Sequence, residues 1–166
     1  MRILGIDPGL GTIGFGLIEK FGHENRAVKY GVIRTTPGLP LATRLLTIHN
    51  DMTELLQALK PDVMAVEELF FNQNITTGIQ VSHARGIILL AAAAAMIPVH
   101  EYNPGSIKLT VTGYGKATKP QMIKMTQQLL KLAKKPTPDD AADALAVALC
   151  HSFHAPMVAA LERQGE

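Results

Sequence analysis

Hydrophobic and polar positions follow two periods along this chain. Short apolar or β-branched runs, broken by glycine-rich or polar turns, predict strands at residues 2–7, 13–20, 27–35, 63–67 and 97–102. Apolar residues spaced three or four apart predict helices at about residues 40–59, 77–96, 119–134 and 139–153. The resulting order is βββ-α-β-α-β-α-α. Three successive strands favour an antiparallel meander, and the later alternation favours parallel strands with crossover helices. We therefore expect an α/β fold with a mixed five-stranded sheet and helices on both faces.

Length and composition narrow the class of protein. The 166 residues, 47% apolar and 18% charged, suit one globular domain, which we place at residues 1–156, with a flexible tail at 157–166. The apolar stretch at 86–99 is too short to span a bilayer, and the first residues lack a long apolar signal region. The single cysteine, Cys150, lies in an apolar run and reads as a core residue. We expect a cytoplasmic protein without membrane association.

Four acidic residues lie in otherwise apolar surroundings. Asp7 ends the run MRILGID, Glu67 ends VMAVE, and Asp140 and Asp143 lie in DDAADALAVAL. A buried carboxylate without a partner costs several kcal/mol, so such groups usually pair with a cation or bind metal. Because no Arg or Lys recurs beside these positions, the pattern favours a divalent-cation site with oxygen ligands.

Two of these assignments have ordinary alternatives. Acidic residues near a helix start are favoured by capping and by the helix dipole, which accounts for Asp139 and could account for Asp140. It does not account for Asp143, one turn further in and flanked by alanines. Glu67 and Glu68 are adjacent, so on a strand they point to opposite faces and only one can join a given site. Composition does not choose between them.

Basic residues are concentrated in one third of the chain. The net charge is only +2, but residues 103–138 contain seven lysines and no acidic residue. They are Lys108, Lys116, Lys119, Lys124, Lys131, Lys134 and Lys135. This segregation favours a surface that faces phosphates, and the alternative is a solvated helix face with chance charge segregation.

Three further motifs have weaker functional interpretations. The glycines at 9, 11 and 14 match the dinucleotide fingerprint, but the following IGFGLIEK is typical of a strand rather than of the helix that such a loop must open. His151 and His154 could form a metal pair, although we favour cations at a helix C-terminus. Phe70, with Phe71 beside it, is either a core residue or an aromatic that stacks on a nucleic-acid base.

Three segments together carry a family resemblance. GIDPGLGTIGFGLI, VMAVEELFFNQN and DDAADALAVAL, in this order and at these separations, resemble the RuvC family of Holliday-junction resolvases, within the RNase H-like superfamily. The resemblance covers about residues 2–153. It implies a catalytic, metal-binding tetrad at Asp7, Glu67, Asp140 and Asp143, which chooses Glu67 over Glu68 and Asp140 over Asp139.

The same resemblance implies further site residues. Lys108 and Lys119 would match the family's lysines near the scissile phosphate, and Phe70 its stacking aromatic. Lys116 and Lys124 would add contacts to DNA. Where RuvC proteins often carry more basic residues near the C-terminus, this chain has only Arg163.

The resemblance also implies a mechanism and partners. We expect hydrolysis of four-way junction DNA with two Mg²⁺ ions about 3.5–4 Å apart, which Mn²⁺ could replace. A homodimer would make paired, symmetric incisions in recombination and repair, together with the RuvA and RuvB branch-migration proteins. The helix at 77–96 is the candidate interface, unless it is simply a central core helix. An RNase H-like nuclease for another substrate, a non-catalytic junction-binding protein and an actin-like ATPase stay open as alternatives.

Overall fold

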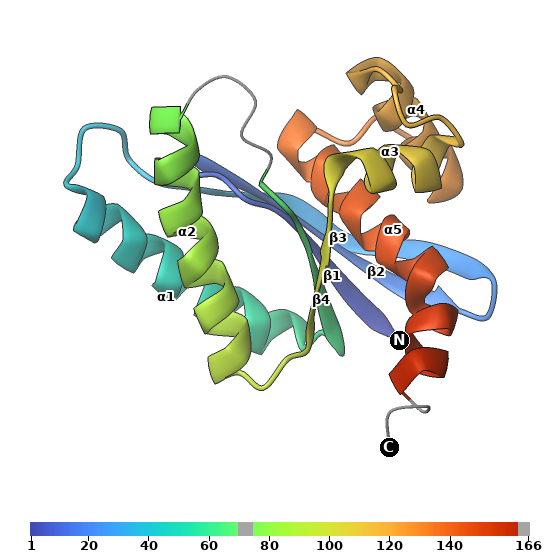
Figure 1. Cartoon of the computed structure of the whole chain (residues 1–166), viewed down its shortest axis with the longest axis horizontal. Helices are drawn as coiled ribbons and strands as arrows, with labels where there is room; N and C mark the ends of the chain where they lie inside the picture. Colours follow the sequence, from blue (N-terminus) through green and yellow to red (C-terminus); the bar gives the residue numbers. More distant parts are fainter. Residues whose placement is uncertain (70–74, 163–166) are drawn as a thin grey trace.

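The fold is a five-stranded mixed sheet between two helical layers (Figure 1). The computed structural model describes residues 1–69 and 75–162, without the side chains of 75–77 and 157–162. Strands β1 (Arg2–Asp7), β2 (Thr12–Phe21) and β3 (Glu24–Arg34) form an antiparallel meander. Strands β4 (Val63–Glu67) and β5 (Val99–Tyr102) add in parallel beside β1, which gives the order β3-β2-β1-β4-β5. The expected sheet is therefore confirmed.

Two apolar clusters cover the two faces of the sheet. Helices α1 (Leu41–Leu59) and α2 (Ile75–Ala94) pack on one face, around residues such as Leu4, Ile6 and Val66. Helices α3 (Pro104–Thr112), α4 (Lys119–Leu129) and α5 (Asp139–Glu162) form the opposite layer, and α5 lies against β1 and β2. Figure 1 shows the two layers on opposite sides of the sheet. No helix in the described parts of the chain is long and apolar enough to cross a membrane.

Helix α3 is the one element that the sequence pattern did not predict. Asn103-Pro104-Gly105 reads as a strand-ending turn, but Asn103 is the N-cap of α3, and its side-chain oxygen accepts a hydrogen bond from the Ser106 amide at 2.8 Å. Pro104 occupies the first turn, where its missing N–H costs nothing. The Asn-Pro pair was therefore a cap signal.

The C-terminal helix is longer than expected. We predicted that it ends at residue 153, but α5 continues past Pro156 to Glu162. His151 and His154 consequently lie inside the helix rather than at its C-terminus, so their expected role as terminal cations is wrong. The side chains from residue 157 lie outside the described part, and the flexible tail stays a prediction.

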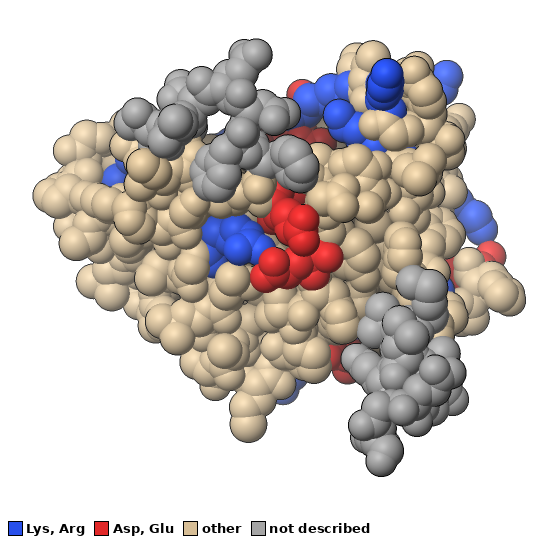
Figure 2. Space-filling view, viewed as in Figure 1, with Lys and Arg blue, Asp and Glu red and all other residues tan. Residues whose placement is uncertain are grey.

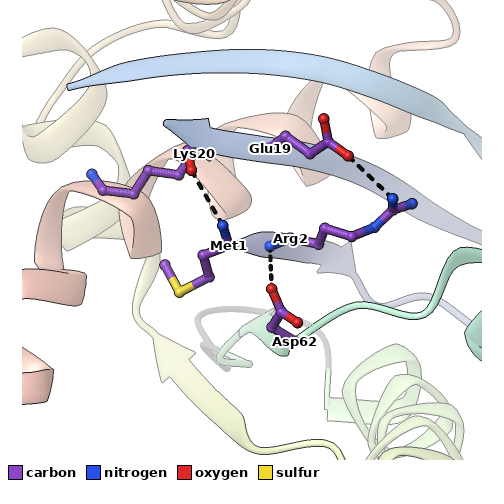
Figure 3. A network of polar contacts seen from close by, with 5 residues as sticks. All are labelled: Met1, Arg2, Glu19, Lys20 and Asp62. Atoms are coloured by element: carbon purple, nitrogen blue, oxygen red, sulfur yellow. Dashed lines mark hydrogen bonds and ion pairs between the residues drawn. The ribbon is translucent and has the colours of Figure 1, made fainter. Parts of the chain in front are cut away.

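A polar network holds the end of the sheet at which β1 begins (Figure 3). The terminal amino group of Met1 donates to the Lys20 carbonyl at 3.2 Å, and the Arg2 amide donates to Asp62 Oδ2 at 2.6 Å. Arg2 Nη1 also pairs with Glu19 Oε1 at 3.1 Å. These contacts tie the beginning of β1 to β2 and to the residue before β4. They lie at the opposite end of β1 from Asp7.

Candidate active site

Asp7 and Glu67 lie at the carboxyl ends of adjacent parallel strands. Ile6 of β1 pairs with Val66 of β4, and each acid is the next and last residue of its strand. Side chains alternate between the two faces along a strand. Ile3, Val63 and Ala65 pack in the apolar cluster beneath α5, and Asp7 and Glu67 lie an even number of residues further along the same strands. Both acids therefore point to the face that α5 covers. Glu68, one residue further, continues the ladder through its amide to the Tyr102 carbonyl at 2.9 Å and falls on the other face. Strand geometry therefore chooses Glu67.

Glycines let α5 approach the sheet closely enough to bring its acids to this point. A Cβ atom on Gly14 would collide with the Asp140 carbonyl oxygen, and one on Gly5 would lie 2.6 Å from the Ala148 nitrogen. A Cβ on Gly16 would lie 2.8 Å from the Leu145 side chain. Helix α5 thus lies directly on the backbone of β1 and β2. Gly14 is paired with Asp7 in the sheet, so this contact places the first turns of α5 beside Asp7.

Burial and mutual repulsion make the acidic cluster unable to carry its full charge. The pKa of Asp7 is raised to about 8, first by burial and then by the charges of Glu67, Asp143 and Asp140. The pKa of Glu67 is also raised, by burial and by Asp143, while a hydrogen bond from Asp7 and the charges of Lys108 and Lys119 oppose the shift. The protonated Asp7 carboxyl therefore donates to the Glu67 carboxylate.

Two lysines complete the site. Lys119 Nζ contacts Asp143 Oδ2 at 2.8 Å, and this contact raises the pKa of Lys119. Lys108, from α3, acts on Glu67 by charge. A cavity of about 240 Å³ is lined by Glu67, Asp143, Lys108 and Lys119, with apolar side chains of α3, α4 and α5. In Figure 2, acidic side chains lie between the two helical layers, with basic side chains beside them over α2 and further basic side chains over α3 and α4.

The donor set suits a hard divalent cation, although it is not a ready-made cage. Among the described residues, no three His, Cys, Asp or Glu side chains converge closely enough to hold a metal ion as they stand. Asp143 contacts Lys119 instead, at 2.8 Å. The raised pKa values of Asp7 and Glu67 reflect negative charge that a cation would relieve. The residues therefore fit a metal that binds as the carboxylates turn toward it.

The remaining predicted site residues are less closely associated with the acidic cluster. Asp140 acts on Asp7 by charge more weakly than Glu67 and Asp143 do, and Asp139 pairs with Lys135 at 3.1 Å. Lys116 is exposed in the connection between α3 and α4. Lys124 is exposed on α4, where it lines a groove of about 370 Å³ together with Lys119 and Lys135. Phe70 and Phe71 lie outside the described residues.

His151 and His154 do not form a metal centre with any third ligand in the described parts of the chain. His151 is buried, stacks on His100 at 4.7 Å between ring centroids, and its Nδ1 lies 2.8 Å from the Tyr102 hydroxyl. Burial lowers the pKa of His151 to about 4. It is a neutral, hydrogen-bonded core histidine.

Comparison with known proteins decides the family. Residues 3–151 match the family described as crossover junction endodeoxyribonuclease RuvC. The chain belongs to the RuvC family. The RuvC protein of Brevibacillus brevis is 52% identical over 152 residues, which cover 92% of each chain. That of Moorella thermoacetica is 52% identical over 156 residues, covering 94% of this chain and 93% of the relative.

Solved structures agree with this membership. The Thermus thermophilus RuvC in complex with a Holliday junction substrate superposes with a TM-score of 0.88 at 37% identity, covering 95% of this chain and 96% of that one. The yeast mitochondrial Holliday junction resolvase matches with a TM-score of 0.69 at 14% identity, over 91% of this chain and 77% of that one, which concerns the fold alone. The fold is the RNase H-like fold of the RuvC structures.

Proposed function

We propose that this chain resolves four-way DNA junctions by metal-dependent hydrolysis of phosphodiester bonds at the acidic cluster. The observation that supports this most is the pair Asp7 and Glu67, whose pKa values are raised by burial and by neighbouring acids, with Asp143 and two lysines beside them. A structural protein gains nothing from such a cluster, because uncompensated buried carboxylates are destabilising. The similarity to a RuvC bound to a Holliday junction supplies the substrate class.

The proposed metal ligands are Asp7, Glu67, Asp140 and Asp143. Mg²⁺, for which we propose two ions per site, would supply an activated water and stabilise negative charge at the phosphate. Mn²⁺ should substitute, because carboxylate and water oxygens suit it equally. Asp7 and Glu67 come from rigid strand ends and hold fixed positions. Asp143 comes from α5 and pairs with Lys119 through Oδ2, so it would bind a cation through Oδ1 or by turning away from Lys119.

The lysines would exchange partners when substrate binds. In the metal-free protein Lys119 neutralises Asp143 at 2.8 Å. If Asp143 helped to hold a cation, the Lys119 ammonium would be available to an oxygen of the scissile phosphate, where it would offset developing charge. Lys108 lines the same cavity from α3 and would contact the phosphate from the other side. Lys116 and Lys124 would bind backbone phosphates further along the strand, and Phe70 would stack on unpaired bases at the crossover.

A homodimer would place two such sites on the two-fold symmetric junction. Helix α2 supports this arrangement. Its inner face, with Ala84 and Ile88, is buried against the sheet, but Ile79 and Leu90 on its outer face are 51% and 56% exposed. Gly86 lies between them, with open space where its Cβ would be. We propose that this outer face meets the same face of a second copy. We also propose cooperation with RuvA and RuvB, which the family resemblance supports.

Cleavage of matched substrates tests the proposal. We expect Mg²⁺-dependent incision of a four-way junction much faster than incision of a linear duplex or an RNA–DNA hybrid of the same sequence. Asp7→Asn should lower the cleavage rate by roughly 10³-fold or more, since a metal ligand contributes several kcal/mol to the transition state. Binding to the junction should survive. Comparable rates on all three substrates, or normal cutting by the variant, would refute the proposal.

A further inference from the structure

Thr35 holds the turn that follows Asp7. Residues 8–11 connect β1 to β2, and Thr35 donates two hydrogen bonds to this turn. Its amide donates to the Gly11 carbonyl at 3.1 Å, and its hydroxyl donates to the Leu10 carbonyl at 2.6 Å. Thr35 is only 5% exposed, and Leu10 is buried in the core beneath α1. The turn beside Asp7 is therefore anchored to the α1 side of the sheet.

Arg44 extends this network toward solvent. From the first turns of α1, its Nε donates to the Thr35 hydroxyl oxygen at 2.9 Å. One of its terminal nitrogens, Nη2, lies beside Gly11, 3.7 Å from where a Cβ of that residue would be. The guanidinium is thus held by its inner nitrogen, with the turn after Asp7 against its outer end.

The charge of Arg44 has no acidic partner among the described residues. Arg2 pairs with Glu19 at 3.1 Å, and Arg85 pairs with Glu101 at 2.6 Å. Arg44 instead contacts a neutral hydroxyl, and its remaining donors form the planar fork that binds phosphate oxygens well. A fixed, half-buried arginine without a counter-ion is arranged to receive an anion.

Its position complements the lysines. Lys108 and Lys119 flank the acidic cluster from the α3–α5 layer, whereas Arg44 stands on the α1 layer. Figure 1 shows the end of β1, the beginning of α1 and the beginning of α5 at the same end of the sheet. A nucleic-acid strand that crosses Asp7 would therefore meet cations on both sides. We infer that Arg44 binds a backbone phosphate neighbouring the scissile one, on the side away from the lysines. The inference rests on the proposed function.

The salt dependence of junction binding tests this inference. We would introduce Arg44→Gln, which keeps a donor for Thr35 but removes the charge, and Arg44→Lys, which keeps a charge. All proteins would carry Asp7→Asn to prevent cutting. Loss of one phosphate contact reduces the slope of log affinity against log salt by about one, so the affinity ratio between about 50 and about 200 mM salt should shrink about threefold. Arg44→Lys should keep the parent slope.

Two controls separate a phosphate contact from other effects. Arg26→Gln removes the same charge from an exposed site near the opposite end of the sheet and should leave the slope unchanged. Thr35→Val removes the anchoring hydroxyl but no charge, so it should weaken affinity without lowering the slope. A parent slope in Arg44→Gln, or an equal decrease in Arg26→Gln, would overturn the inference. A parent protein with no preference for junction over duplex would instead count against the proposed function, and the slopes measured on duplex would still decide the role of Arg44.

Discussion

The Asp7 carboxyl shows how a single residue can carry a functional cost. It ends a buried strand, faces three other acids, and has its pKa raised to about 8. The neighbouring lysines do not neutralise the Asp7 carboxyl, because the lysine contact in this cluster, that of Lys119, is made with Asp143. Divalent cations supply the missing positive charge in such sites. The acidic cluster thus lowers the free energy of unfolding of the metal-free protein, and metal binding would raise it again.

The raised pKa of Asp7 predicts how the stability of the metal-free protein depends on pH. Between its ordinary pKa of 3.8 and the raised value of about 8, Asp7 keeps a proton in the folded state that it loses on unfolding. Because the folded state binds more protons, the free energy of unfolding falls as pH rises through this window. Melting in chelator from about pH 5 to about pH 9 should show a declining Tm, and each kcal/mol lost corresponds to about 2–4 °C.

Asp7→Asn provides the matched comparison. An uncharged amide of the same size removes the titration, so the variant should melt above the wild type near pH 8 and lose that advantage toward pH 5. Added Mg²⁺ should raise the Tm of the wild type far more than that of the variant. A wild-type Tm that rises steadily with pH in chelator would contradict the account.

At the residue scale, the sequence indicated candidate acidic residues and left the choice among neighbouring acids to geometry. Asp7 and Asp143 stood out because each is isolated in apolar surroundings. Glu67 could not be separated from Glu68 by composition, since the choice depends on which face of β4 the helix α5 covers. Arg44 was missed because its role depends on Thr35, nine residues away, and on a turn more than thirty residues away.

At the scale of elements, the decisive contact is that of α5 with the glycines of β1 and β2. Of these glycines, only Gly14 belongs to a motif that the sequence analysis identified, the dinucleotide fingerprint. In the fold, Gly5, Gly14 and Gly16 are positions where a side chain would strike the α5 backbone or Leu145. Strand and helix periods could be predicted locally, but this packing could not, because it depends on where a helix more than 120 residues later docks.

Gly14→Ala should therefore impair both folding and cleavage. Its methyl group would collide with the Asp140 carbonyl oxygen and push the first turn of α5 away from Asp7. Overpacking of this kind costs about 1–3 kcal/mol, which urea unfolding would measure. Cleavage by the folded fraction should fall further, because a displacement of about 1 Å at a catalytic group can cost roughly 10²-fold.

Gly115→Ala is the control for that substitution. Its Cβ would lie 4.0 Å from the nearest backbone oxygen, which is an ordinary contact, and its backbone does not require a positive φ. Stability should stay within about 0.5 kcal/mol of the wild type. If Gly14→Ala were equally mild, close docking of α5 on β2 would not be what positions the acids.

At the scale of the whole molecule, one active site explains one incision, and a junction needs two. The sheet edges are formed by β3 and β5, and the outer face of α2 exposes the apolar side chains of Ile79 and Leu90. Helix α2 was predicted from its apolar period as either an interface or a core helix. Ile88 is fully buried, so the inner face is part of the core, and Leu90 at 56% exposed leaves the outer face free for the proposed interface.

Leu90→Glu should separate the proposed dimer into monomers. Two-fold symmetry would bring the substitution into the interface twice, and burying unpaired carboxylates costs several kcal/mol, so we expect the dissociation constant to rise by about 10²-fold or more. Sedimentation measures that change directly. Leu46→Glu, on α1, is the matched control, because Leu46 is a similarly exposed leucine at 59% on a different helix.

Junction products give an independent readout of the same variant. A monomer keeps an intact acidic cluster, so Leu90→Glu should still nick junctions at high protein concentration, but the two nicks should become uncoupled and appear as singly cut intermediates. The wild type and Leu46→Glu should convert junctions to paired linear products without accumulating that intermediate. Coupled cutting by a dimeric Leu90→Glu protein would exclude the outer face of α2 as the interface and leave the active site assignment untouched.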